Sequence, residues 1–155
     1  DGEHFTIGKL KATVIHTPGH TPEHISLLVT DRSRGPEPWF LLSGHTLMVG
    51  DLGRTELASD AESGARALWR SARRLLELPD YIEVFPGAFA GSVCGRALSG
   101  KPSSSIGFER LFNRALQIGS EAEFVAHMTA NIPEPPPNAA QNRAVNMGLR
   151  QEVGS

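Results

Sequence analysis

Apolar and polar residues alternate along the first third of the chain, with the period expected of half-buried β-strands. The alternation predicts a hairpin of two strands, over 4–7 and 10–16, joined by a turn at Gly8 and Lys9. Further strands are expected over 25–29, 39–43 and 81–85. The polar stretch DRSRGPEP (31–38) predicts the loop between the strands on either side of it.

From residue 59 onward the apolar period lengthens to nearly four residues, as in an amphipathic helix. Ser59 and Glu62 match a helix-capping pattern, and Pro79 is expected to stop the helix. Its predicted buried side comprises Ala65, Leu68, Trp69, Ala72, Leu75 and Leu76. A second helix is expected over 105–116 and a third from the Ser120/Glu123 capping pair.

The length of 155 residues fits one domain of ordinary size, which we place at 1–131. The stiff stretch IPEPPP begins a Pro-rich spacer and tail over 132–155, in which one short helix is expected. The chain opens directly in strand-like alternation, without an initiator methionine. We therefore expect it to be the middle of a longer protein.

Composition and net charge restrict the classes of binding partner more than they restrict the function. The formal net charge is −2, which gives no electrostatic reason to expect nucleic acid or an anionic membrane as a partner. No apolar run is long enough to cross a bilayer. Cys94 is the single cysteine and cannot form an internal disulfide, which fits a reducing compartment. The predicted location is the cytoplasm.

Candidate chemistry is concentrated in two loops rich in Gly and Thr. His20 lies in TPGHT (17–21) and His45 in SGHT (43–46), each beside a predicted strand. Neutral imidazole is the commonest metal ligand, and strand ends hold it in place, so these two histidines predict a metal site. Asp51 is the alternative ligand, and His24 is expected to support the site or lie at the surface.

These loops, together with VGDLGRTEL (49–57) and GSVCGRALSGKPSSSIGFERLFNRAL (91–116), resemble the second half of a metallo-β-lactamase-fold domain. Within that superfamily the sequence resembles the branch of glyoxalase II and the persulfide dioxygenases, in particular those fused to rhodanese domains. The resemblance implies an α/β (α+β) fold, the second half of an αββα sandwich, with metal ligands on loops at one edge of its two sheets.

The resemblance also implies a function. Persulfide dioxygenases hold one non-haem iron and oxidise glutathione persulfide with O₂, which implies Fe(II) as cofactor and a glutathione-type thiol or persulfide as substrate. Arg54, in GRTEL, is implied as a substrate anchor, with a purely structural arginine as the alternative. The alternative functions are a zinc-dependent thioester hydrolase of glyoxalase II type and a catalytically inactive binding or assembly module.

Three departures from the family pattern shape these expectations. The HxHxDH motif, which carries the first metal histidine, is absent, so a companion chain or self-association is expected to complete the domain. His45 stands where the family has a metal-binding aspartate, which implies a three-histidine site with one histidine from the missing half. Ala88 stands where the family has a histidine, which disfavours a dinuclear hydrolase.

Overall fold

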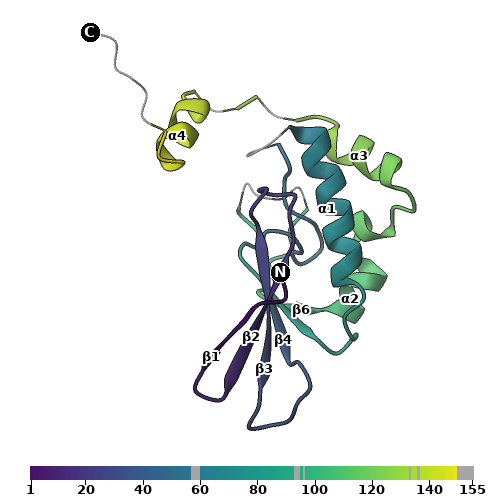
Figure 1. Ribbon diagram of the computed structural model, residues 1–155. Helices are drawn as coiled ribbons and strands as arrows, with labels where there is room; N and C mark the ends of the chain where they lie inside the picture. Colours follow the sequence, from purple (N-terminus) through teal and green to yellow (C-terminus); the bar gives the residue numbers. More distant parts are fainter. Residues whose placement is uncertain (57–59, 93–94, 96, 133, 136, 150–155) are drawn as a thin grey trace.

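A single mixed sheet of six strands forms the framework of the molecule (Figure 1). The computed structural model describes residues 1–56, 60–92, 95, 97–132, 134–135 and 137–149. The strands lie in sequence order, β1 (His4–Ile7), β2 (Leu10–His16), β3 (Ile25–Asp31), β4 (Phe40–Gly44), β5 (Glu83–Pro86) and β6 (Ser104–Ser105). Only β4 and β5 pair in parallel, because α1 connects them, and the other neighbours are antiparallel.

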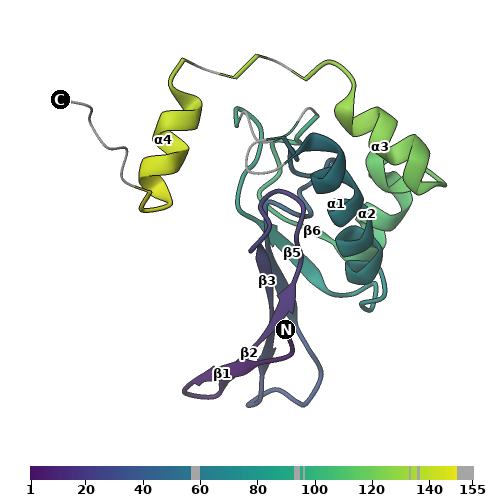
Figure 2. The same cartoon turned by 45° about the horizontal axis from the view of Figure 1, so that its top comes forward.

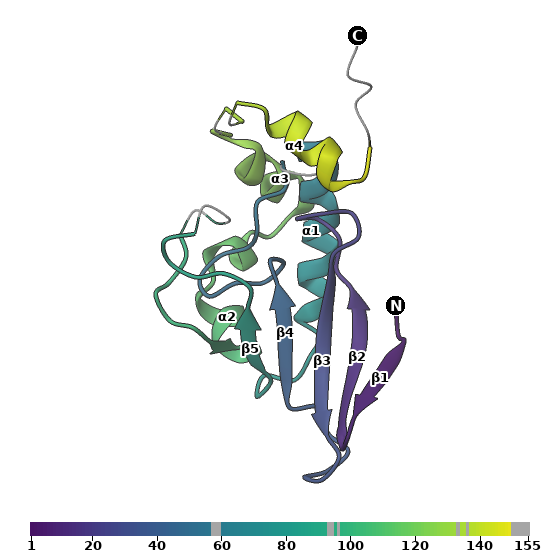
Figure 3. The same ribbon diagram turned by 90° about the vertical axis from the view of Figure 1, so that its left-hand side faces the viewer.

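Helices cover one face of this sheet. They are α1 (Ala61–Leu75), α2 (Ile106–Phe112), the 3₁₀ helix η1 (Arg114–Gln117) and α3 (Glu121–Thr129). Figure 3 looks onto the strands with α1 behind them, and Figure 2 shows α4 (Ala139–Asn146) set apart from the other helices. No helix among the described residues reaches the length and hydropathy of a bilayer span.

The hydrophobic core lies between the sheet and α1. Alternate strand residues such as Leu41 and Val84 face this side and are fully buried, as are Leu68 and Leu75 of α1. Phe124 of α3 packs on Trp69 of α1, at 5.2 Å between ring centroids, and extends the core to the outer helix. The core therefore joins β2, β4 and β5 to α1 and α3.

The opposite face of the sheet is also apolar, although none of the described helices covers it. The cross-strand register places Phe5, Leu42 and Phe85 on this side, with exposed fractions of 46%, 41% and 37%. Ile25 lies on the same face and is 47% exposed. Large apolar side chains in this arrangement mark a surface that packs against another element or partner.

Most predicted elements are confirmed, including the hairpin, the strand at β5, the capping of α3 by Ser120 and the tail helix α4. The described residues form one sheet and one helix layer, and the second sheet of the predicted αββα sandwich is not among them. The division at 131/132 remains a prediction.

Two predictions about helices need correction. Asp60 caps α1 by accepting a hydrogen bond from the Ser63 backbone amide at 2.8 Å, whereas Ser59 lies outside the described residues. The second helix is not continuous over 105–116. It ends at Phe112, because Asn113 adopts an extended backbone and caps η1 through its side chain.

Candidate metal centre

Three loops meet at one edge of the sheet because β2, β4 and β5 all end there. The loop after β2 carries His20 and the loop after β4 carries His45. Their imidazole rings stack, with centroids 4.7 Å apart and planes 18° from parallel. The structure thus brings together the two histidines that the sequence predicts as metal ligands.

A hydrogen bond fixes the tautomer of His20. Its Nδ1 lies 2.8 Å from the carbonyl oxygen of Arg54, and since a carbonyl only accepts, Nδ1 carries the proton and donates. The lone pair of the neutral ring is therefore on Nε2. A metal-binding histidine usually binds the metal through one ring nitrogen and donates a hydrogen bond from the other to a carbonyl or carboxylate oxygen.

Glycines leave room for the histidine pair. A Cβ at Gly53 would overlap the carbonyl oxygen of His45 and lie 3.4 Å from Nδ1 of His20. A Cβ at Gly87, at the end of β5, would lie 3.2 Å from Cε1 of His45. A side chain at Gly53 would therefore collide with the backbone of His45, and one at Gly87 would press on its imidazole.

His24 holds the backbone of His45 in place. Its Nε2 accepts a hydrogen bond from the backbone amide of His45 at 3.0 Å, so Nδ1 carries the proton. Nδ1 lies 2.9 Å from Thr17 Oγ1 and 3.0 Å from Thr46 Oγ1. Both ring nitrogens are thus occupied, and His24 fixes the loop that carries His45, in agreement with the supporting role expected from the sequence.

The local environment favours the neutral form of His24 and of His45. Burial, followed by the nearby His20 and His45, lowers the pKa of His24 to about 4. Burial, and then the proximity of His20, lowers the pKa of His45 below its usual range. Neutral imidazole is the form that binds metal, so His45 is in the required state at neutral pH.

Asp51, the alternative ligand, is engaged elsewhere. Its carboxylate accepts hydrogen bonds from the backbone amides of Leu52 at 2.8 Å and Ala97 at 2.9 Å, and the residue is 6% exposed. These contacts tie the loop after β4 to the segment before β6. The geometry favours a structural role for Asp51.

Arg54 lies at the site but has its own acidic partner. Its guanidinium forms an ion pair with Glu56, and both side chains are largely buried. Its backbone carbonyl orients His20, so Arg54 contributes to the site through its backbone. The predicted role in substrate anchoring remains a prediction.

Sequence reasoning missed Glu109 and Asn113, which are both fully buried. Glu109 accepts hydrogen bonds from the Gly50 amide at 2.7 Å, Ser104 Oγ at 2.7 Å and Asn113 Nδ2 at 3.0 Å. Asn113 Nδ2 also lies 3.1 Å from the carbonyl oxygen of Asp51. The sequence pattern did not indicate their buried hydrogen bonds, because both residues lie in a segment with the pattern of an ordinary amphipathic helix.

As a donor set, the two stacked imidazoles fit a metal such as iron or zinc in type but not in number. Within the part of the chain that the structure describes, no group of three or more His, Cys, Asp or Glu residues could hold a metal ion. Ala88, at the third loop, has only a methyl group and is buried. The described residues therefore offer two imidazole donors at this edge of the sheet, and a metal bound there would need ligands beyond them.

Known proteins share both the sequence and the fold. No protein-family model matches the chain. A metallo-β-lactamase from Staphylococcus aureus superposes with a TM-score of 0.86 at 36% identity, covering 99% of this chain and 45% of the other. ETHE1 from Myxococcus xanthus gives a TM-score of 0.71 at 29% identity, covering 96% of this chain and 59% of the other.

A curated relative adds a third point of comparison. A hydroxyacylglutathione hydrolase of Methylococcus capsulatus is 34% identical over 85 residues, which are 55% of this chain and 29% of the relative. The chain spans less than two thirds of each of these three proteins.

Proposed function

Because the chain has a metallo-β-lactamase-like α/β fold and is related to hydroxyacylglutathione hydrolases and to ETHE1, we propose that it provides two histidine ligands, His20 and His45, of a thiol-processing metal centre. The metal is a single Fe(II) and the reaction is the oxidation of glutathione persulfide by O₂. The observation that carries the proposal is the stacked histidine pair, in which the Arg54 carbonyl directs the lone pair of His20 to Nε2.

The proposed ligand set favours an anionic persulfide as the substrate. His45 is neutral, so a site of three histidines leaves the metal more positive by one charge than a site with two histidines and a carboxylate. An anionic persulfide is attracted to that charge. A bound metal would supply Lewis-acid polarisation and a meeting point for the reactants. The residues of this chain hold and orient it, with His24 fixing the backbone of His45.

A zinc-dependent thioester hydrolase is the second candidate, and the hydroxyacylglutathione hydrolase relative favours it. Ala88 weighs against a dinuclear version of this enzyme, because its methyl group offers no donor atom for a second metal. The identity of the bound metal and the reaction with a thioester distinguish the two candidates.

The remaining ligands come from a companion sheet that packs on the uncovered face of β1–β5. Two observations support this part of the proposal. That face presents Phe5, Leu42 and Phe85 to solvent, and the chain accounts for 45% of the S. aureus protein with which it superposes at a TM-score of 0.86. The companion sheet is either a further segment of the same protein or a second chain.

Elemental analysis of the protein together with its companion half tests the proposal. We expect close to one iron per site, and a sharp fall in His45→Ala and in His20→Ala because each removes one donor. His127→Ala removes an exposed histidine from α3 and should keep the metal. The intact protein should then consume O₂ in the presence of glutathione persulfide.

Other results would contradict the proposal in identifiable ways. Stoichiometric zinc together with thioester hydrolysis would favour the second candidate. The absence of metal from folded, complete protein would leave a non-catalytic binding or assembly module.

A further inference from the structure

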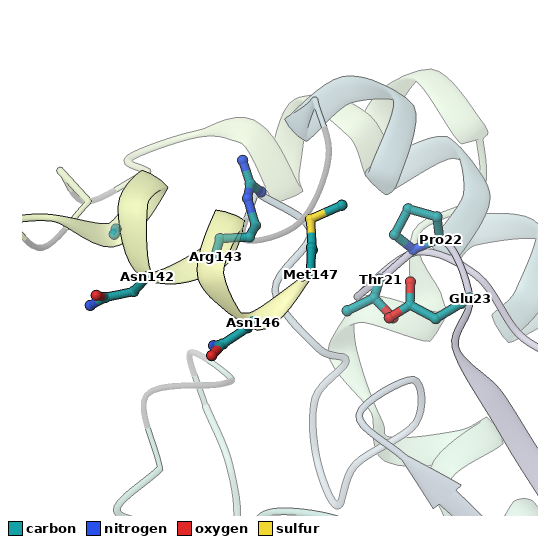
Figure 4. Close-up of a pocket in the computed structure, with 8 residues that line it drawn as sticks. Thr21, Pro22, Glu23, Asn142, Arg143, Asn146 and Met147 are labelled. Atoms are coloured by element: carbon teal, nitrogen blue, oxygen red, sulfur yellow. The ribbon is translucent and has the colours of Figure 1, made fainter. Parts of the chain in front are cut away.

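A groove of about 500 Å³ lies between α4 and the loop that follows β2. In Figure 4 the loop residues Thr21, Pro22 and Glu23 form one wall, and Met147 extends toward them from the end of α4. Arg143 lines the groove from the helix. The groove therefore has a cationic group on one wall and an anionic group on the other.

The loop residues that line this groove are neighbours of His20 in the sequence. Thr21 directly follows His20. Arg143 also lines a neighbouring hollow with Glu56, the ion-pair partner of Arg54. Helix α4 thus faces both of the loops that fix His20.

The side chains define the chemistry of a ligand. A guanidinium binds a carboxylate in bidentate fashion. The Glu23 carboxylate suits an ammonium group, and the Met147 thioether and the Pro22 ring offer apolar contact for a methylene chain. The combination matches the amino-acid end of a small peptide, which carries both charges on one carbon.

We infer that this groove binds the zwitterionic amino-acid end of a thiol substrate whose sulfur lies at His20 and His45. Arg143 binds the carboxylate of that end and Glu23 binds its ammonium group. The inference rests on the proposed function, because it assumes that the substrate is a peptide thiol. It assigns to α4 the selection of the substrate, separate from the loops that hold the metal.

Calorimetric titration of the complete, metal-loaded protein with three thiols tests the inference. Glutathione has both charges at its γ-glutamyl end, glutathione acetylated on its α-amino group keeps only the carboxylate there, and γ-aminobutyryl-cysteinyl-glycine keeps only the ammonium group, with the same spacing from the sulfur in all three. We expect Arg143→Gln to weaken the binding of glutathione and of its acetylated form by about tenfold and to leave that of γ-aminobutyryl-cysteinyl-glycine unchanged. We expect Glu23→Gln to weaken the binding of glutathione and of γ-aminobutyryl-cysteinyl-glycine and to leave that of the acetylated form unchanged.

Two control variants accompany this titration. Arg143→Lys keeps the charge and should recover part of the lost affinity. Arg70→Gln removes an exposed arginine from α1, away from the groove, and should leave all three dissociation constants unchanged.

The inference fails if Arg143→Gln and Glu23→Gln bind all three thiols like the unmodified protein, or weaken them equally. Metal content and O₂ consumption report on the proposed function separately. A protein that holds iron and oxidises persulfide, and yet shows no charge-selective effect at Arg143 and Glu23, would refute the groove alone.

Discussion

At the scale of single residues, the candidate site depends on which ring nitrogen of each histidine carries the proton. His20 and His24 both carry it on Nδ1, but their Nε2 atoms differ in role. Nε2 of His20 has the lone pair available for a metal, whereas Nε2 of His24 accepts from the His45 amide. Identical side chains four residues apart therefore differ in function: Nε2 of His20 is free of the backbone amide that Nε2 of His24 binds.

The low pKa of His24 predicts a pH dependence of stability in the metal-free protein. The folded pKa of about 4 lies below the ordinary value of 6.5, so the unfolded chain binds more protons between these two pH values. The free energy of unfolding should therefore fall as the pH drops from about 6.5 to about 4. Urea denaturation in the presence of a chelator, repeated across this range, measures the dependence.

Two variants isolate the contribution of His24 from that of the acidic residues. His24→Gln cannot bind the extra proton, so its stability should depend less steeply on pH in this window. His127→Gln alters an exposed histidine of α3 and should retain the full dependence. Equal slopes in all three proteins would show that His24 titrates normally.

At the scale of elements, the loop after β4 is held from behind by α2. Glu109 accepts the backbone amide of Gly50, in the same loop that presents His45 and Arg54. A buried carboxylate with three hydrogen-bond donors is costly to replace, because each donor loses its partner. The position of the loop that carries His45 therefore depends on a helix that is distant in sequence.

We predict that Glu109→Ala lowers the free energy of unfolding by about 2 to 4 kcal/mol, because it leaves buried donors unpaired and opens a cavity. Urea denaturation measures the change. Glu77→Ala truncates an exposed glutamate just after α1 and should change stability by less than about 0.5 kcal/mol. A loss as small in Glu109→Ala as in this control would contradict the structural role of Glu109.

At the scale of the whole molecule, the sheet has two apolar faces, of which the described helices cover only one. The helix layer buries Leu41 and Val84 completely, whereas Leu42 and Phe85, their neighbours along the strands, remain partly exposed. Adjacent strand residues point to opposite faces, so β4 and β5 carry apolar side chains typical of a buried core on both faces. Such a sheet is stable in water when a second layer covers its other face.

We predict that the isolated chain self-associates through the uncovered face. Size-exclusion chromatography with light scattering should give a mass above the 16.7 kDa of one chain. A double variant, Leu42→Lys and Phe85→Lys, should shift the mass toward that of a monomer, because it places charge on this face. Leu111→Lys, at a 67% exposed position on α2, should leave the association unchanged. A stable monomer of the unmodified chain would refute the prediction.

The sequence determined the local structure of this protein and the residue types at its site. Alternation of apolar residues predicts the hairpin and strands, and the capping pair at Ser120 predicts the start of α3, because these features depend on contacts a few residues apart. The glycines and threonines around His20 and His45 indicate turns that present side chains at strand ends. The sequence therefore predicts which two histidines lie together at the edge of the sheet.

Only the tertiary structure decided how those residues are used. The break after Phe112 depends on hydrogen bonds from Asn113 to Glu109 and to Asp51, which lies 62 residues away. The same kind of long-range contact engages Asp51 with backbone amides, sets the tautomer of His20 through Arg54 and places His24 under His45. Hydrogen bonds between distant segments form only when the sheet aligns its strand ends, so no local pattern in the sequence records them.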